Sequence, residues 1–272
     1  MIQYRELIKK IIASNGSVFT GDGTNTYLIG KSDITIVDPG PNIDHHVKTI
    51  IKEVGDNAKR ILVTHTHRDH SPAAKVLGDS LNIPLYGMLV AKDDSLQDKT
   101  FKPNELLKHG DIIKTDEYEI NVIHTPGHAS NHLCYLIPEC SVLLTGDHIM
   151  NGSTVVIAPP DGNMQQYLSS LKLLKDYDFD YIGPGHGDFL SNPIEVVNWI
   201  INHRMEREKK IIKKLSNKGA CNIDKLVKAV YDDVDSNLHP IALWSLQAHL
   251  EKLRDEDQAS YDDQTNSWSI KA

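Results

Sequence analysis

The feature that most constrains this chain is the segment 64–70, which reads Thr-His-Thr-His-Arg-Asp-His. It follows a short apolar run, which predicts a buried strand that ends where the segment begins. Imidazole and carboxylate groups are the ligands that Zn²⁺ and related divalent ions take. His65 and His67 are two positions apart and can converge on one ion, whereas Asp69 and His70 are adjacent and must diverge. The segment therefore predicts two metal ions side by side.

Three later strand-like runs also end in turns that combine glycine or threonine with a candidate ligand. In chain order, these turns carry His128, Asp147 and His186. The carboxyl ends of strands are where layered α/β proteins build their sites, and glycine there lets the backbone bend sharply. We expect one ion to be held by His65, His67 and His128, the other by Asp69, His70 and His186, with Asp147 bridging both.

This predicted ligand set leaves an open position at each ion, as in catalytic rather than structural metal sites. Two ions roughly 3.5–4 Å apart can share a hydroxide and stabilise the charge that develops on substrate oxygens. Asp69 can also orient that hydroxide, and His148 is the candidate for proton transfer. The predicted reaction is metal-assisted hydrolysis of an ester, a thioester or a phosphodiester.

Other polar residues near the expected strand ends have less decisive patterns. Asp38 can brace a ligand segment or form an Asx turn before Pro-Gly, and the sequence favours neither. His45 and His46 precede an amphipathic helical pattern, so we expect both to be exposed helix-start residues. His124 and His132 fit packing, or support of a ligand, better than direct metal binding.

Composition limits the partners and the location. The net charge is −8, so no global basic field attracts nucleic acid. The charged N-terminus, residues 1–10, does not resemble a secretory signal, and no apolar run reaches membrane-spanning length. The three cysteines form no CxxC pair, which favours reduced structural cysteines and a cytoplasmic protein.

The pattern changes near residue 191, so we expect a hydrolase domain over 1–190 and a C-terminal module over 191–272. Three helical patterns and a hairpin-like end make that module resemble a winged helix. Its first helix has an apolar edge that begins at Ile194 and a face rich in basic side chains. The basic residues are Arg204, Arg207, Lys209, Lys210, Lys213 and Lys214. Such a face fits a solvated helix or contact with a nucleic-acid backbone.

The pattern His-x-His-x-Asp-His, with His128, Asp147 and His186 downstream, resembles the metallo-β-lactamase superfamily. The resemblance covers about residues 17–190 and implies an αββα sandwich with the dinuclear site at one edge of two sheets. True metallo-β-lactamases carry Cys near the position of Asp147, which argues against antibiotic hydrolysis. Flavodiiron proteins carry Glu where this chain has His67, which argues against that redox branch.

Within the superfamily, the chain is most similar to the β-lactamase-like protein 2 family, in a bacterial-type form. The similar segments are residues 125–128, 145–147 and 183–187, the helix that carries His203 and Arg204, and the C-terminal module. Members of that family are associated with zinc-dependent cleavage of single-stranded RNA. The resemblance therefore implies two Zn²⁺ ions and an RNA substrate, while the same ligand types also serve Fe and Mn.

Three functions follow as hypotheses. The first is an endoribonuclease that acts on single-stranded RNA. The alternative is a glyoxalase II-like thioesterase for small acyl-thioesters, although the C-terminal helices show no recognisable basic site for a glutathione carboxylate. The third is a nucleic-acid-binding module with structural metals, against which the predicted open coordination argues. The sequence does not indicate an oligomeric state.

Overall fold

The computed structural model describes residues 6–90 and 96–271. The extreme N-terminus, on which the expectation about a secretory signal largely depends, lies outside these residues. Within them are two six-stranded sheets, ordered β1-β2-β3-β4-β5-β6 and β12-β11-β10-β9-β8-β7. The first contains β1 (Ile8–Ile12), β2 (Asn25–Ile29), β3 (Ile34–Val37), β4 (Ala58–Leu62), β5 (Leu85–Gly87) and β6 (Glu105–Leu106). The second contains β7 (Ile112–Lys114), β8 (Glu119–His124), β9 (Leu133–Ile137), β10 (Val142–Gly146), β11 (Tyr181–Pro184) and β12 (Leu190–Ser191).

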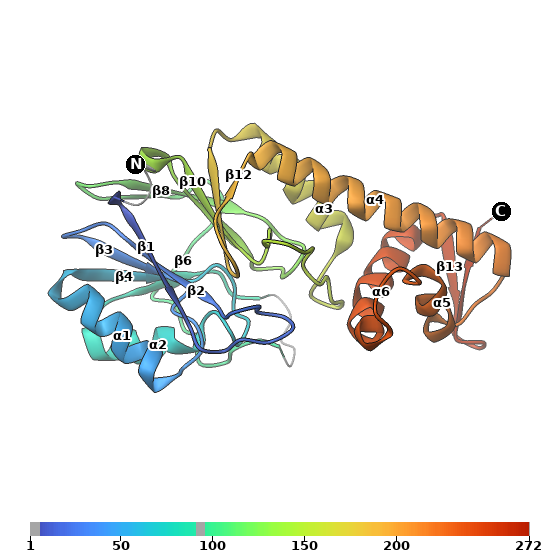
Figure 1. The fold of residues 1–272 in the computed structure, drawn as a ribbon, viewed down its shortest axis with the longest axis horizontal. Helices are drawn as coiled ribbons and strands as arrows, with labels where there is room; N and C mark the ends of the chain where they lie inside the picture. Colours follow the sequence, from blue (N-terminus) through green and yellow to red (C-terminus); the bar gives the residue numbers. More distant parts are fainter. Residues whose placement is uncertain (1–5, 91–95, 272) are drawn as a thin grey trace.

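Helices cover the outer face of each sheet (Figure 1). The helices are α1 (Asp44–Val54), α2 (Pro72–Leu81), α3 (Met164–Leu173), α4 (Pro193–Lys218), α5 (Ile223–Val230) and α6 (His239–Asp255). Short 3₁₀ turns lie at Gly55–Asn57, Pro138–Cys140, Leu174–Asp176 and Ser236–Leu238. Helices α1 and α2 pack on the first sheet, whereas α3 and the start of α4 pack on the second. The αββα sandwich that the family resemblance implies is confirmed.

The alternation of side chains along the strands explains why three apolar layers form. In β4, Ile61 packs with the helix layer, whereas Leu62 packs with residues of the second sheet. Strand β10 repeats this pattern, because Leu143 faces α3 and Leu144 faces the first sheet. Every residue of β10 is buried, as expected for a strand covered on both faces.

The ligand-bearing turns meet because their strands end at one edge of the sandwich. Strand β3 runs parallel to β4, and β10 runs parallel to β11. The two sheets touch at this edge, where Asn25 N donates to Gly185 O at 2.8 Å and Thr24 pairs with His186. The carboxyl ends of strands from both sheets therefore face one another.

The C-terminal module is a winged helix, as expected. Helices α4, α5 and α6 pack with the hairpin of β13 (Ala259–Asp262) and β14 (Ser267–Ile270). Helix α4 belongs to two cores, because Val197 packs with the sandwich and Leu215 packs with the module (Figure 1). The predicted boundary near residue 191 therefore precedes a helix that both parts share.

Two expectations about polar helix residues are wrong. His46 is buried rather than exposed, and its Nε2 bonds Thr26 Oγ1 at 2.9 Å, because the first turn of α1 lies against the sheet. His45 is exposed, as expected. On α4, Arg204 and Arg207 are buried rather than part of a solvated face, because Arg204 packs against the loop before α3 and Arg207 against the end of α5. Ile194, assigned to the apolar edge, is exposed.

The remaining expectations about location are tested only in part. Cys134, Cys140 and Cys221 are buried and form no disulfide, as expected for structural cysteines. Among the helices of the described residues, none is long and apolar enough to cross a membrane.

Candidate metal centre

The segment after β4 holds four of the candidate ligands in a tight turn. Strand β4 ends at Leu62, and α2 begins at Pro72, so the segment has little freedom. The turn is closed by His70 N, which donates to His67 O at 3.0 Å, while Gly40 N donates to His70 O at 2.8 Å. Both bonds fix the backbone from which the imidazoles and the carboxylate project.

The structure brings three histidines together in a first group, His65, His67 and His128. His67 Nδ1 lies 3.0 Å from His65 Nε2 and 3.0 Å from His128 Nε2. His128 is contributed by the turn after β8, so this group joins both sheets. It is the set of three that the sequence predicts for one ion.

A second group contains Asp69, His70, Asp147 and His186. His186 Nε2 lies 3.2 Å from Asp69 Oδ2 and 3.3 Å from Asp147 Oδ1, and His70 Nε2 lies 3.3 Å from Asp147 Oδ1. The other oxygen of Asp147, Oδ2, lies 3.6 Å from His128 Nε2 of the first group. Asp147 therefore turns one oxygen to each group, which is the arrangement of a bridging carboxylate.

These spacings fit divalent ions. With metal–ligand bonds of about 2.0–2.1 Å, two ligand atoms of a tetrahedral zinc ion lie about 3.3 Å apart. The distances within both groups lie around that value. Apart from their contacts within this group, His70 Nε2 and Asp147 Oδ1 are buried and have no hydrogen-bond partner among the described residues, which leaves both atoms available to a cation. The His and Asp residues are thus positioned for a dinuclear metal site.

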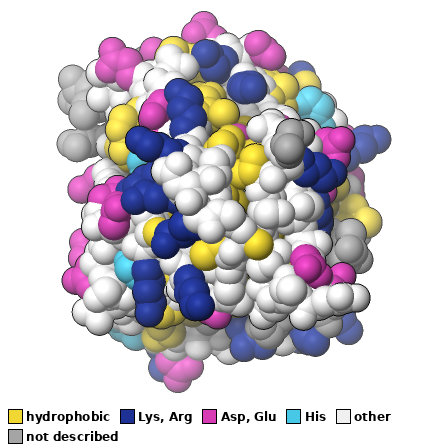
Figure 2. Space-filling view, turned by 90° about the vertical axis from the view of Figure 1, so that its right-hand side faces the viewer, with side chains coloured by type: hydrophobic (Ala, Val, Ile, Leu, Met, Phe, Trp, Pro, Cys, Tyr) yellow, Lys and Arg dark blue, Asp and Glu magenta, His cyan; other side chains and the backbone are white. Residues whose placement is uncertain are grey.

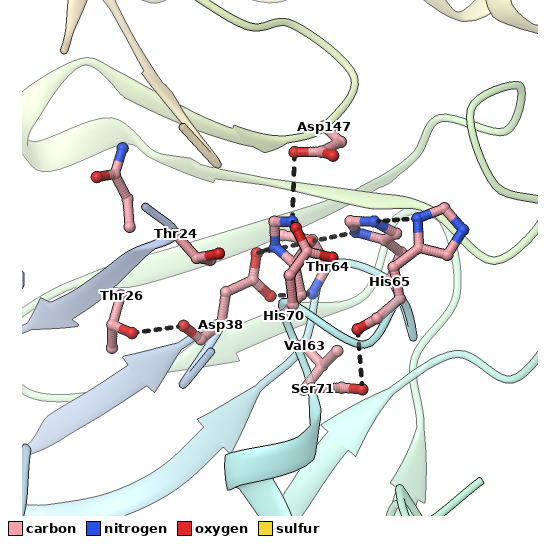
Figure 3. Close-up of polar contacts among 12 residues, drawn as sticks. Thr24, Thr26, Asp38, Val63, Thr64, His65, His70, Ser71 and Asp147 are labelled. Carbon is pink, nitrogen blue, oxygen red and sulfur yellow. Dashed lines mark hydrogen bonds and ion pairs between the residues drawn. The ribbon is translucent and has the colours of Figure 1, made fainter. Parts of the chain in front are cut away.

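Asp38 braces two of these ligands (Figure 3). Its Oδ2 bonds His70 Nδ1 at 3.0 Å and accepts from Thr64 Oγ1 at 2.7 Å, while Oδ1 accepts from Thr64 N at 2.7 Å. The Thr64 hydroxyl in turn bonds His65 Nδ1 at 3.0 Å. Metal-binding imidazoles usually donate their second N–H in this way, which fixes the tautomer. Of the two interpretations open for Asp38, the structure supports the bracing one.

Other imidazoles have similar support. His128 Nδ1 bonds Val156 O at 2.8 Å, and His186 Nδ1 bonds Gly23 O at 3.1 Å, so both rings present Nε2 to the cluster. His132 is buried beside the cluster, and its Nε2 accepts from Asp147 N at 3.2 Å. His124 bonds Ser130 O and lies in neither group. Supporting roles for these two residues agree with the expectation.

The two groups differ in electrostatics. Burial and neighbouring imidazoles lower the pKa of His67 to about 3 and that of His65 well below its usual value. Burial also opposes a charge on His186, but Asp147 and Asp69 outweigh it and raise the pKa of His186 to about 9. The same carboxylates raise the pKa of His70 well above its ordinary range. The carboxylate-rich group therefore attracts positive charge strongly.

His148 does not reach the cluster in the way that proton transfer would need. It is fully buried, and neither ring nitrogen has a hydrogen-bond partner among the described residues. Its ring packs against the Tyr167 ring, with 5.0 Å between the ring centres, and burial lowers the pKa of His148 to about 3. A buried imidazole without a polar partner cannot pass a proton to a substrate. We therefore do not assign His148 a catalytic role.

A cavity of about 460 Å³ opens on the cluster between the sandwich and the C-terminal helices. His128 and Asp147 form its metal-facing end. Its wall contains residues of the loop before α3, of α4 and of α6, among them Val155, Trp199, Arg204 and Ala242. A second cavity of about 300 Å³ meets the same two ligands and is lined by Asp69, Phe19 and Trp244. The sequence pattern could not reveal this enclosure, because it depends on how α4 and α6 dock.

The family model described as the metallo-beta-lactamase superfamily matches residues 19–186, which include all seven clustered side chains. The chain belongs to the metallo-β-lactamase superfamily. A second model, the beta-lactamase associated winged helix domain, matches residues 223–268. The superfamily fold thus carries a winged-helix module here.

Comparisons with individual superfamily members cover nearly the whole chain. A beta-lactamase-like protein 2 homolog of Drosophila melanogaster is 30% identical over 91% of this chain and 87% of that protein. An atrochrysone carboxyl ACP thioesterase of Cryptosporiopsis sp. is 22% identical over 96% of this chain and 84% of that protein. The solved structure of a metallo-beta-lactamase family protein from Thermus thermophilus has a TM-score of 0.83, with 17% identity over 98% and 99% of the two chains.

Gly185 provides a test of the cluster geometry. A Cβ at this position would lie 2.6 Å from Asp147 Oδ1 and 2.8 Å from His70 Cε1. We expect Gly185→Ala to push these side chains apart and to lower metal content and hydrolysis by at least about tenfold, as changes around metal ligands do. Metal analysis and circular dichroism check the effect. Full metal content in a folded Gly185→Ala variant would contradict the geometry.

Proposed function

We propose that this protein hydrolyses small thioesters or esters with two divalent metal ions, of which Zn²⁺ is the first choice. The proposed ligands are His65, His67, Asp69, His70, His128, Asp147 and His186. One observation carries the proposal: the cluster opens into a largely apolar cavity of about 460 Å³ between the sandwich and the C-terminal helices. Such a cavity suits the organic body of a small acyl substrate.

In the proposed reaction, water adds to the acyl carbon, the carbon–sulfur bond breaks, and the thiol leaves with a proton. The two ions, when bound, would activate the water and polarise the acyl carbonyl. Of the two carboxylate ligands, Asp69 is the more exposed, since 30% of its side chain is accessible compared with 11% for Asp147. Asp69 therefore orients the attacking water, while the apolar wall keeps other water away from the acyl group.

Relatives support thioesters as the substrate class. The fungal protein named as an ACP thioesterase aligns with 96% of this chain, so the likeness includes the module that encloses the cavity. A metal hydrolase for thioesters needs little more than the two ions and a shaped apolar site, and this chain has residues for both. We extend the thioesterase activity to it on that basis.

An endoribonuclease is the second candidate, and the cavity entrance carries the observation in its favour. Phe19, Trp199 and Trp244 line the two cavities and are exposed, as aromatic side chains that stack on bases are. Figure 2 shows Lys and Arg side chains gathered on the C-terminal face, with Asp and Glu among them. On α4, however, Lys210 and Lys214 pair with Asp232, so much of the predicted basic face is neutralised.

A substrate panel tests the proposal. Zinc-, iron- and manganese-loaded protein is assayed with N-acetylcysteamine thioesters, nitrophenyl esters and a labelled single-stranded RNA. We expect thioester or ester turnover that needs bound metal, with RNA left intact. Cleavage of RNA without turnover of any ester would overturn the choice of thioesters and favour the second candidate.

Because the cysteines are unpaired, we also propose a reducing location such as the cytoplasm.

A further inference from the structure

Arg204 is a buried cation whose position the proposed chemistry has not used. It lies on α4, is only 3% exposed and contributes to the wall of the cavity that opens on the cluster. Its Nη2 donates to Val155 O, and its guanidinium lies 5.4 Å from the centre of the Tyr167 ring. Its Nε is buried and has no hydrogen-bond partner among the described residues.

Several other cations of α4 have carboxylate partners, whereas Arg204 has none within ion-pair distance in the part of the chain that the structure describes. Arg207 makes a bidentate pair with Asp233, at 2.7 and 3.0 Å. Lys209 pairs with Glu206 at 2.7 Å. The contrast is local, since these residues lie within a turn or two of Arg204 on one helix.

An unpaired guanidinium is costly to bury, because it gives up water without gaining a counter-charge. The neighbouring His203 adds a second open polar site, since its Nδ1 is also buried without a hydrogen-bond partner among residues 6–90 and 96–271. The His203 ring stacks on Trp199, with 5.5 Å between the ring centres. His203, Arg204 and Trp199 all line the same cavity. The cavity thus has a polar, cationic region on its α4 wall, away from the metal ligands in sequence and on a different element.

We propose that this region binds an anionic group of the substrate, a carboxylate or a phosphoryl group, through Arg204 with His203 beside it. The inference rests on the proposed hydrolase function and narrows its substrate class to acyl compounds that carry a negative charge. One substrate would then be held at two points, with its acyl carbon at the metal cluster and its anionic group at Arg204. A planar guanidinium suits both anions, because it offers paired N–H donors.

A structural role for Arg204 makes a different prediction. Arg204 holds Val155 O, and the next carbonyl, Val156 O, supports His128. If Arg204 only anchors this loop, its loss would weaken hydrolysis of charged and neutral substrates alike. If it binds an anion, its loss would remove the preference for charged substrates. Arg204→Gln separates the roles, because it removes the charge, and the neutral substrates then report whether the loop at Val155 is still held.

The experiment compares wild type, Arg204→Gln and Arg204→Met on matched thioesters of N-acetylcysteamine. One series carries ω-carboxyacyl chains from succinyl to suberoyl, a second carries ω-phosphonoacyl chains, and a third carries neutral acyl chains of equal length. We expect wild type to prefer one anionic series, and both variants to lose roughly 10–100-fold of that preference, mainly through KM. Lys209→Met, which removes an exposed cation of the same helix, is the control and keeps the preference.

A binding measurement separates this inference from the proposed activity. Thermal unfolding is followed with millimolar glutarate or methylphosphonate, which need no turnover. We expect one of these anions to raise the Tm of wild type and of Lys209→Met by on the order of 2–5 °C, and to leave that of Arg204→Gln unchanged. Equal shifts in wild type and Arg204→Gln, or no shift in either, would overturn the anion site. Absence of all thioester turnover, with the Arg204-dependent shift intact, would instead reject the proposed reaction and keep the site.

Discussion

Asp147→Asn is expected to lower kcat/KM for thioester hydrolysis about 10³-fold, the scale seen when a key charge-stabilising group is lost. Asparagine keeps the size of the side chain but removes its negative charge and one acceptor oxygen. In the structure the two carboxylate oxygens face different groups, with Oδ1 at 3.3 Å from His186 and Oδ2 at 3.6 Å from His128. Loss of this bridge should also reduce the metal content from two ions to about one per chain.

The measurement combines kinetics on the best thioester with elemental analysis of the purified variant. Asp79→Asn makes the same chemical change on an exposed residue of α2 that pairs with Lys75, so it serves as the control. It should keep both metal content and rate. If Asp147→Asn kept two ions and the wild-type rate, the bridging assignment would be wrong.

Removal of the metal by a chelator is expected to abolish hydrolysis and to lower the Tm by about 10 °C. A ligand present at 1,000 times its Kd stabilises a fold by about 4 kcal/mol, and 1 kcal/mol shifts the Tm of a chain of this size by about 2–4 °C. Without cations, the negative charges of Asp69 and Asp147 repel each other, and the imidazoles of His70, His128 and His186 are what lies beside them.

Calorimetry before and after chelation, followed by readdition of Zn²⁺, Fe²⁺ or Mn²⁺, checks this prediction. The ion that restores both Tm and turnover at the lowest concentration is the one the site prefers. Because the two sheets have their own apolar layers, the chain should stay folded without metal at room temperature. Global unfolding on chelation would contradict a catalytic site and favour a structural one.

Much of the fold and the cluster could be predicted from sequence because the relevant signals are local. The buried strand predicted before residue 64 is β4, which ends at Leu62, and the turns that carry Asp147 and His186 follow β10 and β11. The seven candidate ligands each follow a strand, so one rule about strand ends brings them together. Asp69 and His186 lie far apart in the chain, yet the geometry places them within 3.2 Å of each other.

What could not be predicted depends on docking between distant elements. Periodicity tells which residues of a helix share a face, but not what covers the opposite face. Arg204 and Arg207 fit a solvated basic face in the sequence, whereas the loop that contains Val155 and the end of α5 bury them. The expectation for His46 is wrong for the same reason, since its partner Thr26 lies on a strand twenty residues earlier.

The sharing of α4 between two cores has a mechanical consequence. A helix of 26 residues is about 39 Å long, and sharp kinks in helices usually occur at a proline or a glycine. Beyond Pro193 at its first position, α4 contains neither residue, so Trp199 and Arg204 lie on one continuous helix whose start packs on the sandwich. A substrate held at both Arg204 and the metal cluster, as proposed above, must therefore span the separation between that helix and the cluster.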